Sequence, residues 1–237
     1  MRLQRVARAL LRKPAKMLWP VDVSGAHRVP TEGAAVLCPN HLSFFDSVLM
    51  MLTFDRPVYF IGKSDYLDRG LTRRLFPAMG MIPIDRDNGT KAMVALDAAA
   101  SVLEQGALLC VYPEGTRSRD GYLHRGHTGA ARLALSAGCP LLPIGIRGTA
   151  AIQPPGALLP RLRRRCAVAV GEPVVADTTA DSRRLAARDA IDEVMRRIAT
   201  LSGQQYVPTY AGRQRSDQPV TSSANVYVPV GSSYVVT

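Results

Sequence analysis

Between residues 34 and 170, short apolar runs alternate with longer segments of helical periodicity, and this alternation limits the fold more than any other feature. The apolar runs predict strands at residues 34–38, 57–62, 81–84, 107–112, 140–146 and 166–170. The periodic segments predict helices at residues 47–52, 71–76, 90–105 and 128–138, with a final helix at 182–201. Such alternation is typical of an α/β domain, so we expect a mixed, mostly parallel sheet flanked by helices.

The chain divides into three parts by composition. Residues 1–20 are basic and amphipathic, and residues 21–202 contain the alternating α/β pattern. Residues 203–237 are rich in Ser, Gln, Thr and Val and have no usable period. We expect this tail to be disordered, because its apolar residues do not recur at a spacing that would bury them together.

The N-terminal segment has the pattern of an amphipathic helix. Its first nineteen residues include six Lys or Arg and no acid. On a helical wheel the basic residues fall on one side, and the other side carries Leu3, Val6, Ala7, Leu10 and Leu11. Charge of a single sign opposite an apolar side, with Trp19 close behind, favours an interfacial helix on an anionic membrane surface. The alternative is a helix docked on the domain with its basic face in solvent.

Net charge and cysteine spacing limit the partners and the compartment. The net charge of +11 requires an acidic partner, such as nucleic acid, an anionic membrane or a phosphorylated substrate. No nucleic acid is expected, because no RNP-like, zinc-finger or helix-turn-helix signature occurs. The four cysteines lie far apart beside apolar residues, which predicts buried free thiols. Neither a secretory signal nor a long apolar run occurs, so we expect a cytoplasmic protein, or one attached to a membrane from that side.

Residues 40–46, NHLSFFD, contain the strongest candidate for catalysis. His41 follows a predicted strand and a Pro-Asn turn signal, which places it in a loop before a helix. Asp46 lies five residues later, far enough for a turn to bring its carboxylate back onto the imidazole. The pair would comprise a base and the group that orients it, although a histidine before a helix is also common as a structural residue. No GxSxG elbow, Walker loop, GxGxxG or HExxH motif offers another scheme.

Three further segments bring polar residues to the ends of predicted strands. GMIPIDR, residues 80–86, ends in Asp85 and Arg86. VYPEGTRSRDG, residues 111–121, turns at Pro-Glu-Gly-Thr-Arg, and its arginine and threonine are suited to binding phosphate oxygens. The alternative for this second segment is a surface turn with an internal Glu-Arg salt bridge. PLLPIGIRGT, residues 140–149, reads as a buried strand with an arginine at its exit.

Taken in order, the blocks NHLSFFD, GMIPIDR, YPEGTRS and PLLPIGIRG resemble those of the glycerolipid acyltransferase family, which includes the 1-acylglycerol-3-phosphate acyltransferases. The resemblance spans roughly residues 25 to 175, within a domain at residues 21–202 that would be the acyltransferase domain. One block alone would be a weak signal, whereas four in the same order are specific.

The resemblance implies a chemistry for the first block. His41 would act as the general base and remove the proton from a glycerol hydroxyl as that oxygen attacks an acyl thioester. Asp46 would accept a hydrogen bond from the other ring nitrogen and stabilise the imidazolium that forms. The donor would be acyl-CoA or acyl carrier protein, and the acceptor would be the sn-2 hydroxyl of lysophosphatidic acid. Neither a metal nor a cofactor is required by this mechanism.

The second and third blocks are implied to bind the glycerol phosphate. The residues assigned to this role by resemblance are Arg86, Glu114, Gly115, Thr116 and Arg117. The fourth block, which includes Pro143, is associated with the acyl donor. One departure stands out: many relatives have Phe-Lys where this chain has Gly126-His127, so a cation that could contact the phosphate is replaced.

Two alternatives stay open. The same chemistry could act on glycerol 3-phosphate, another lysophospholipid or an aminolipid. A catalytically inactive scaffold of this family could instead bind a membrane surface or nucleic acid. The implied location is the cytoplasmic face of the cell membrane, as a peripheral protein, where positive charge would attract anionic lipid, the acceptor and a coenzyme A donor.

Overall fold

The computed structural model of the protein describes residues 2–63, 70–84, 89–154, 156–157, 159–177 and 182–212. The helices in these ranges are α1 (Arg2–Leu18), α2 (Phe45–Thr53), α3 (Gly70–Ala78), α4 (Gly89–Glu104), α5 (Gly129–Ala137), α6 (Thr149–Ile152) and α7 (Arg183–Ser202), with a 3₁₀ turn, η1 (Ala26–Arg28). The strands are β1 (Val21–Ser24), β2 (Ala35–Pro39), β3 (Val58–Lys63), β4 (Met81–Ile84), β5 (Leu108–Cys110), β6 (Leu123–His124), β7 (Leu141–Arg147), β8 (Cys166–Val170) and β9 (Tyr206–Val207).

The main sheet has the order β1-β8-β7-β2-β5-β3-β4. All of its strand pairs are parallel except β7 with β8, which confirms the prediction of a mixed, mostly parallel sheet. Because β2, β5 and β7 run in the same direction, the segments that follow them leave the sheet at one edge. Ligand sites of open α/β sheets lie at this carboxyl edge. Here it holds the residues after β2, which include His41.

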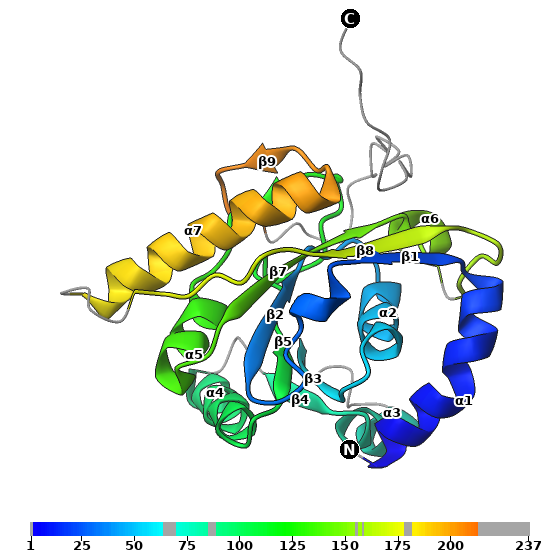
Figure 1. The fold of residues 1–237 in the computed structure, drawn as a ribbon, viewed down its shortest axis with the longest axis horizontal. Helices are drawn as coiled ribbons and strands as arrows, with labels where there is room; N and C mark the ends of the chain where they lie inside the picture. Colours follow the sequence, from blue (N-terminus) through cyan, green and yellow to red (C-terminus); the bar gives the residue numbers. More distant parts are fainter. Residues whose placement is uncertain are drawn as a thin grey trace, which may run out of the picture.

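Helices cover both faces of the sheet (Figure 1), and their packing explains why the strands are apolar throughout. On one face, Val36, Leu109 and Leu141 pack with residues of α4, α5 and α7. On the other, Leu37, Leu108 and Leu142 pack with the apolar side of α2. Alternate residues of each strand therefore enter two cores, and the predicted runs show no polar side.

Helix α1 docks on the domain through Gln4, Arg8 and Arg12 and leaves most of its apolar residues exposed. The amide of Gln4 is buried and donates to the carbonyls of Val58 and Met79, at 2.7 and 2.9 Å, while its oxygen accepts the Val58 N–H at 3.0 Å. Arg8 donates to the carbonyl of Phe54, and Arg12 pairs with Asp55. The apolar residues left exposed are Leu3, Val6, Leu10, Leu11, Met17 and Leu18.

The alternative of a docked helix with its basic face in solvent holds in part: Arg2, Arg5, Lys13 and Lys16 are exposed, whereas Arg8 and Arg12 turn toward the domain. The reason is that the first residues of β3 and the loop before it offer backbone groups and a carboxylate that Gln4, Arg8 and Arg12 satisfy. Among the described residues, no helix has the length and apolar character to cross a bilayer.

The structure also differs from the expected disordered tail over residues 203–212. Here β9 pairs in parallel with β6, and Gln204 is buried beneath the loop that follows β2. The strap of residues 203–212 thus belongs to the folded domain, and it runs beside α7 (Figure 1). Residues 213–237 of the predicted tail lie outside the described residues.

Candidate active site

The site begins with Asn40, at the point where the chain leaves β2. Its side-chain oxygen accepts the N–H of Ile146 at 2.7 Å, and its amide donates to the carbonyl of Ile146 at 2.9 Å and to Gln204 Oε1 at 2.6 Å. Asn40 is fully buried, so each of these bonds replaces a bond to water. The side chain therefore extends the β2–β7 ladder by one step and anchors the loop that carries His41. From the sequence, Pro39-Asn40 indicates only a turn.

His41 and Asp46 are in direct contact. The imidazole Nδ1 lies 2.9 Å from Asp46 Oδ2, and Asp46 is buried in the first turn of α2. The same carboxylate oxygen accepts the backbone N–H groups of Leu42 and Ser43, at 2.7 and 2.8 Å. Since Oδ2 acts as an acceptor for all three groups, Nδ1 carries its hydrogen toward Asp46, and Nε2 retains the lone pair that a base requires.

The ring of Tyr112 packs against the face of the His41 imidazole. The two rings are stacked, with centroids 3.8 Å apart and planes 17° apart. The Tyr112 hydroxyl lies 2.8 Å from Ser47 Oγ, one residue beyond Asp46. Burial raises the pKa of Tyr112 well above its ordinary value, so the phenol stays neutral beside the imidazole. His41 is thus oriented along one ring edge by Asp46 and across its plane by Tyr112, a residue that the sequence patterns did not single out.

Glu114 points into the protein. It is 1% exposed, and its two oxygens accept the backbone N–H groups of His41 at 3.3 Å and His124 at 3.0 Å. Glu114 thus lies after the strand, as expected, but its side chain points inward rather than out of the turn. The reason is that these two N–H groups need acceptors in the interior. Burial raises the pKa of Glu114 to about 8, although the two backbone hydrogen bonds oppose the rise.

Replacing Glu114 with glutamine is expected to flatten the pH dependence of stability. Between pH 4.5, the ordinary pKa, and about pH 8, the folded state holds a proton at Glu114 that the unfolded chain has released. The stability contributed by this group therefore falls as pH rises through that window, by an amount on the order of a few kcal/mol. Urea unfolding at pH 5.5 and 8.5 measures the difference.

In Glu114→Gln this decline should shrink, whereas Glu104→Gln, on the exposed side of α4, should leave it unchanged. An equal decline in the two variants would show that Glu114 does not titrate in this window.

The residues after Glu114 form a turn against His41. Gly115 has a φ of +74°, which favours glycine, and its N–H donates to the carbonyl of Tyr112 at 3.0 Å. Thr116 is exposed and Arg117 is half-exposed. The next residue, Ser118, donates its N–H to the carbonyl of His41 at 2.7 Å. The third block is therefore next to the first, as its predicted role requires, while Arg86 lies outside the described residues.

The departure at Gly126-His127 has a structural cause. A Cβ at position 126 would lie 2.9 Å from the sulfur of Met195 on α7, so a side chain there would require Met195 to move. The His127 ring stacks on Tyr210 of the strap, with centroids 4.6 Å apart and planes 15° apart. The guanidinium of Arg125 also lies over the ring of this tyrosine, 5.4 Å from its centroid. Residues of α7 and the strap thus contact positions 126 and 127.

An apolar cavity of about 610 Å³ opens between α1, β1 and α2. Phe45 and Leu49 of α2 line it, and Trp19 closes part of it from the end of α1. Phe45 directly precedes Asp46 in α2, although neither Asp46 nor His41 lines the cavity. Its volume falls within the range of roughly 300–1,000 Å³ that is usual for ligand pockets.

In the described part of the chain, the cysteines and acidic residues form no second centre. Cys38, Cys110, Cys139 and Cys166 are buried and unpaired, as predicted, and burial raises the pKa of all four thiols. Among the described residues, no group of three or more His, Cys, Asp or Glu is arranged to hold a metal ion.

Comparison with known proteins identifies relatives of the domain that carries this site. A family model described as Acyltransferase matches residues 20–147. The chain is 30% identical over 139 residues to a chloroplastic 1-acyl-sn-glycerol-3-phosphate acyltransferase of Brassica napus, covering 58% of this chain and 40% of that protein. It is 34% identical over 125 residues to the human 1-acyl-sn-glycerol-3-phosphate acyltransferase alpha, covering 52% and 44%.

A 1-acyl-sn-glycerol-3-phosphate acyltransferase of Borreliella burgdorferi is 27% identical, and the match covers 54% of this chain and 52% of that protein. The chain therefore spans about half the length of these curated relatives. Among solved structures, the 1-acyl-sn-glycerophosphate acyltransferase PlsC of Thermotoga maritima superimposes with a TM-score of 0.64. Its identity is 24%, with 85% of this chain and 83% of that chain covered. This likeness shows a shared fold.

Proposed function

Because the chain belongs to the acyltransferase family, we propose that it transfers a fatty acyl chain to the sn-2 hydroxyl of lysophosphatidic acid and forms phosphatidic acid. The observation that carries the proposal is the contact of His41 with a buried Asp46 at the carboxyl edge of the sheet. The curated relatives named above act, by their names, on 1-acyl-sn-glycerol 3-phosphate. The donor is acyl-CoA or acyl carrier protein.

In the proposed mechanism, His41 Nε2 takes the proton from the acceptor hydroxyl as its oxygen attacks the thioester carbonyl. The new O–acyl bond forms, the C–S bond breaks, and the imidazolium can return the proton to the leaving thiolate. Asp46 stabilises the imidazolium through Nδ1, 2.9 Å away, and Tyr112 keeps the ring in plane. Thr116 and Arg117, in the turn against His41, are candidates to bind the acceptor phosphate.

The cavity beside α2 supports an acyl substrate, because apolar residues such as Trp19, Phe45 and Leu49 line it and offer hydrocarbon contacts. The test is to incubate the full chain with lysophosphatidic acid and a long-chain acyl-CoA while following thiol release and phosphatidic acid. Product formation would support the proposal. Turnover only with glycerol 3-phosphate, another lysophospholipid or an aminolipid would reassign the acceptor, and no turnover with any acceptor or donor would favour the inactive scaffold.

We also propose that the protein is peripheral, on the cytoplasmic face of the cell membrane, and that α1 attaches it. The exposed fractions of Leu10 and Met17 are 69% and 83%, although a docked helix ordinarily buries such residues. Basic residues flank this apolar side, which suits an anionic headgroup layer. Four unpaired thiols suit a reducing compartment.

Replacing Leu10 and Met17 with glutamine is expected to weaken binding to anionic vesicles by at least about tenfold, because two side chains no longer transfer from water to the acyl boundary. Co-sedimentation with phosphatidylglycerol vesicles measures the loss. The matched control, Val94→Gln with Leu185→Gln, removes two similarly exposed apolar residues from α4 and α7. Equal binding of both variants would rule out α1 as the anchor.

A further inference from the structure

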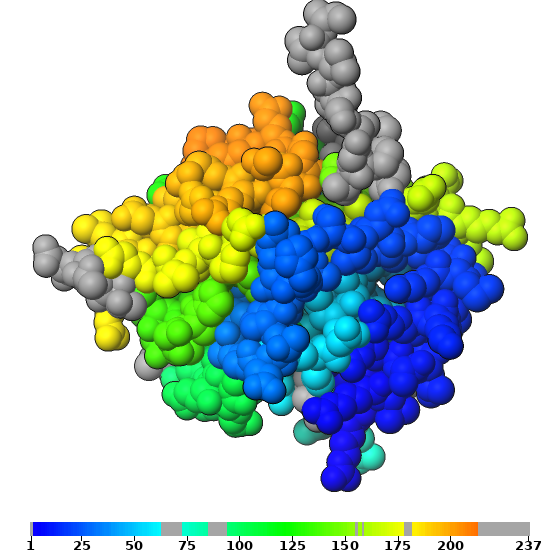
Figure 2. Space-filling model, viewed as in Figure 1, coloured from blue at the N-terminus to red at the C-terminus, as the bar shows by residue number. Residues whose placement is uncertain are grey.

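A short basic loop, residues 159–165 (LPRLRRR), projects beside the end of α1. Leu159 is 78% exposed and Leu162 is 56% exposed, and the four arginines between positions 161 and 165 are exposed as well. Figure 2 shows this segment, in yellow-green, protruding on the side of the molecule that α1 occupies. Neither the predicted fold nor the proposed chemistry uses these side chains.

The backbone of the loop is held firmly on α1. Arg163 donates its N–H to the carbonyl of Leu18 at 2.9 Å, which satisfies a carbonyl at the open end of the helix. The indole of Trp19 donates to the carbonyl of Arg161 at 2.9 Å. Arg163 has a φ of +57° and is the one non-glycine residue with positive φ in the part of the chain that the structure describes. A backbone held in this disfavoured region is constrained by its surroundings, so the loop presents Leu162 in a defined place.

The exposed apolar surface of the loop continues that of α1. Leu162 lies between Arg161 and Arg163, the two residues that bond to the end of α1, where Met17 and Leu18 are also exposed. Leucines set among arginines, next to a tryptophan, suit the boundary of an anionic bilayer, where apolar side chains and cations both find partners. Nucleic acid would satisfy the arginines but not the leucines.

We infer that residues 159–165 form a second membrane-contact element, which places Leu159 and Leu162 among anionic lipid headgroups beside α1. This role rests on the proposed attachment through α1 and adds an independent contact. Its consequence is an orientation for the active site. Arg161 donates its N–H to the carbonyl of Ile152, and the next carbonyl, of Gln153, accepts the hydroxyl of Ser43 from the loop that carries His41. A membrane-bound loop would therefore hold the site at the headgroup layer, where a lysophospholipid resides.

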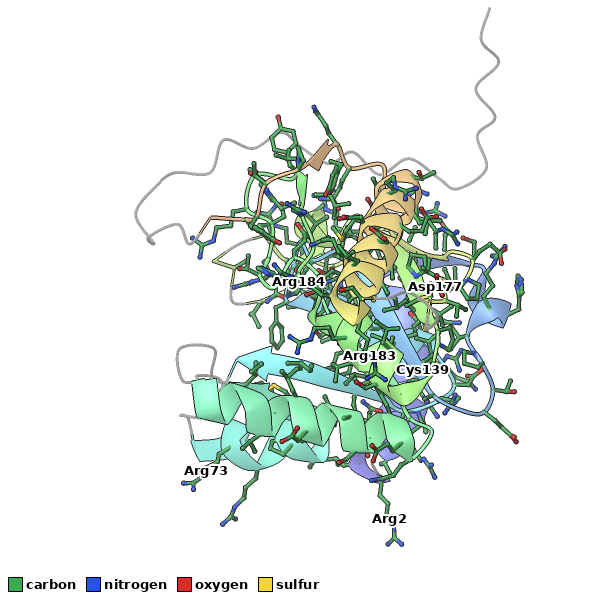
Figure 3. All side chains as sticks on the ribbon, turned by 90° about the vertical axis from the view of Figure 1, so that its left-hand side faces the viewer. Arg2, Arg73, Cys139, Asp177, Arg183 and Arg184 are labelled. Atoms are coloured by element: carbon green, nitrogen blue, oxygen red, sulfur yellow. The ribbon has the colours of Figure 1, made fainter. Side chains whose placement is uncertain are left out.

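The start of α7 offers a control of the same composition. Arg183, Arg184 and Leu185 are exposed there, and Figure 3 labels the two arginines. In Figure 1 this end of α7 lies on the left, whereas the basic loop and α1 lie on the right. The test variant, Leu162→Ala with Arg163→Gln and Arg164→Gln, and the control, Leu185→Ala with Arg183→Gln and Arg184→Gln, remove equal charge and apolar area.

The experiment is co-sedimentation of the full chain with vesicles of phosphatidylglycerol and phosphatidylcholine, and with phosphatidylcholine alone, at fixed salt. We expect the loop variant to lose about thirtyfold in partitioning onto the anionic vesicles, from two arginines near the surface. The control should lose less than about threefold. Equal losses in the two variants, an unchanged loop variant, or no binding of the parent chain would overturn the inference.

Turnover of a lysophosphatidic acid below its micellar concentration separates this inference from the proposed function. A loop variant that keeps its turnover and loses vesicle binding supports the inference, because the site is intact. A variant that loses both would contradict it, since the loop would then act on the site itself. Absence of turnover in the parent chain would count against the proposed function alone, while the binding comparison would still decide the role of the loop.

Discussion

Replacing His41 with alanine is expected to reduce acyl transfer by roughly 10²–10⁴-fold, the usual contribution of a general base. Without the imidazole, no group at this position accepts the hydroxyl proton, because the neighbouring Tyr112 is a neutral phenol. The measurement is phosphatidic acid formation under saturating donor and acceptor. The KM for the acceptor should change little, since the lost interaction belongs to the transition state.

The variant Asp46→Asn should lose activity on the same scale, because an amide carries no charge to stabilise the imidazolium and no longer selects one tautomer. Phe44→Leu, a change at an exposed position between the two residues, is the control and should retain most activity. If His41→Ala kept more than a tenth of the parent turnover, the pair would be structural, as histidines before helices often are.

Replacing Asn40 with alanine is expected to lower the free energy of unfolding by about 3 kcal/mol or more, because the N–H and carbonyl of Ile146 lose partners inside the protein. The side-chain oxygen of Gln204 loses its donor as well. Activity should also fall, since Asn40 anchors the loop that positions His41. Urea denaturation followed by circular dichroism measures the stability.

A double-mutant cycle with Gln204→Ala tests the proposed anchor directly. Because the two side chains are bonded at 2.6 Å, their effects should not add, whereas the exposed neighbour Gln205→Ala should change stability by less than about 0.5 kcal/mol. Additive effects for Asn40 and Gln204 would mean that the strap does not support the site through this bond.

The strands of the sheet centre were predictable because each is buried on both faces, which leaves a continuous apolar run in the sequence. The short strands β1, β6 and β9 were not predicted. They have two to four residues and lie at edges of the fold, so their sequences carry too few apolar positions for a period. Their pairing depends on partners far along the chain, as when β1 adds to β8.

The candidate site divides in the same way. The sequence by itself determined the α/β alternation and the spacing of His41 and Asp46, because a loop and one helix turn are local and five residues suffice to close the contact. Only the tertiary structure decided the rest: Tyr112 against the imidazole, Glu114 turned inward, and the strap that bonds Asn40 through Gln204.

The orientation of α1 also depends on tertiary contacts. The helical wheel does not tell which polar residues face the domain: Gln4, Arg8 and Arg12 turn inward because β3 and the loop before it offer hydrogen-bonding groups there. Contacts of this kind join residues more than 40 positions apart, and their energies depend on which groups burial has left without water. The pattern along the chain shows which residues are apolar. The hydrogen-bond partners of the polar residues depend on how distant segments pack.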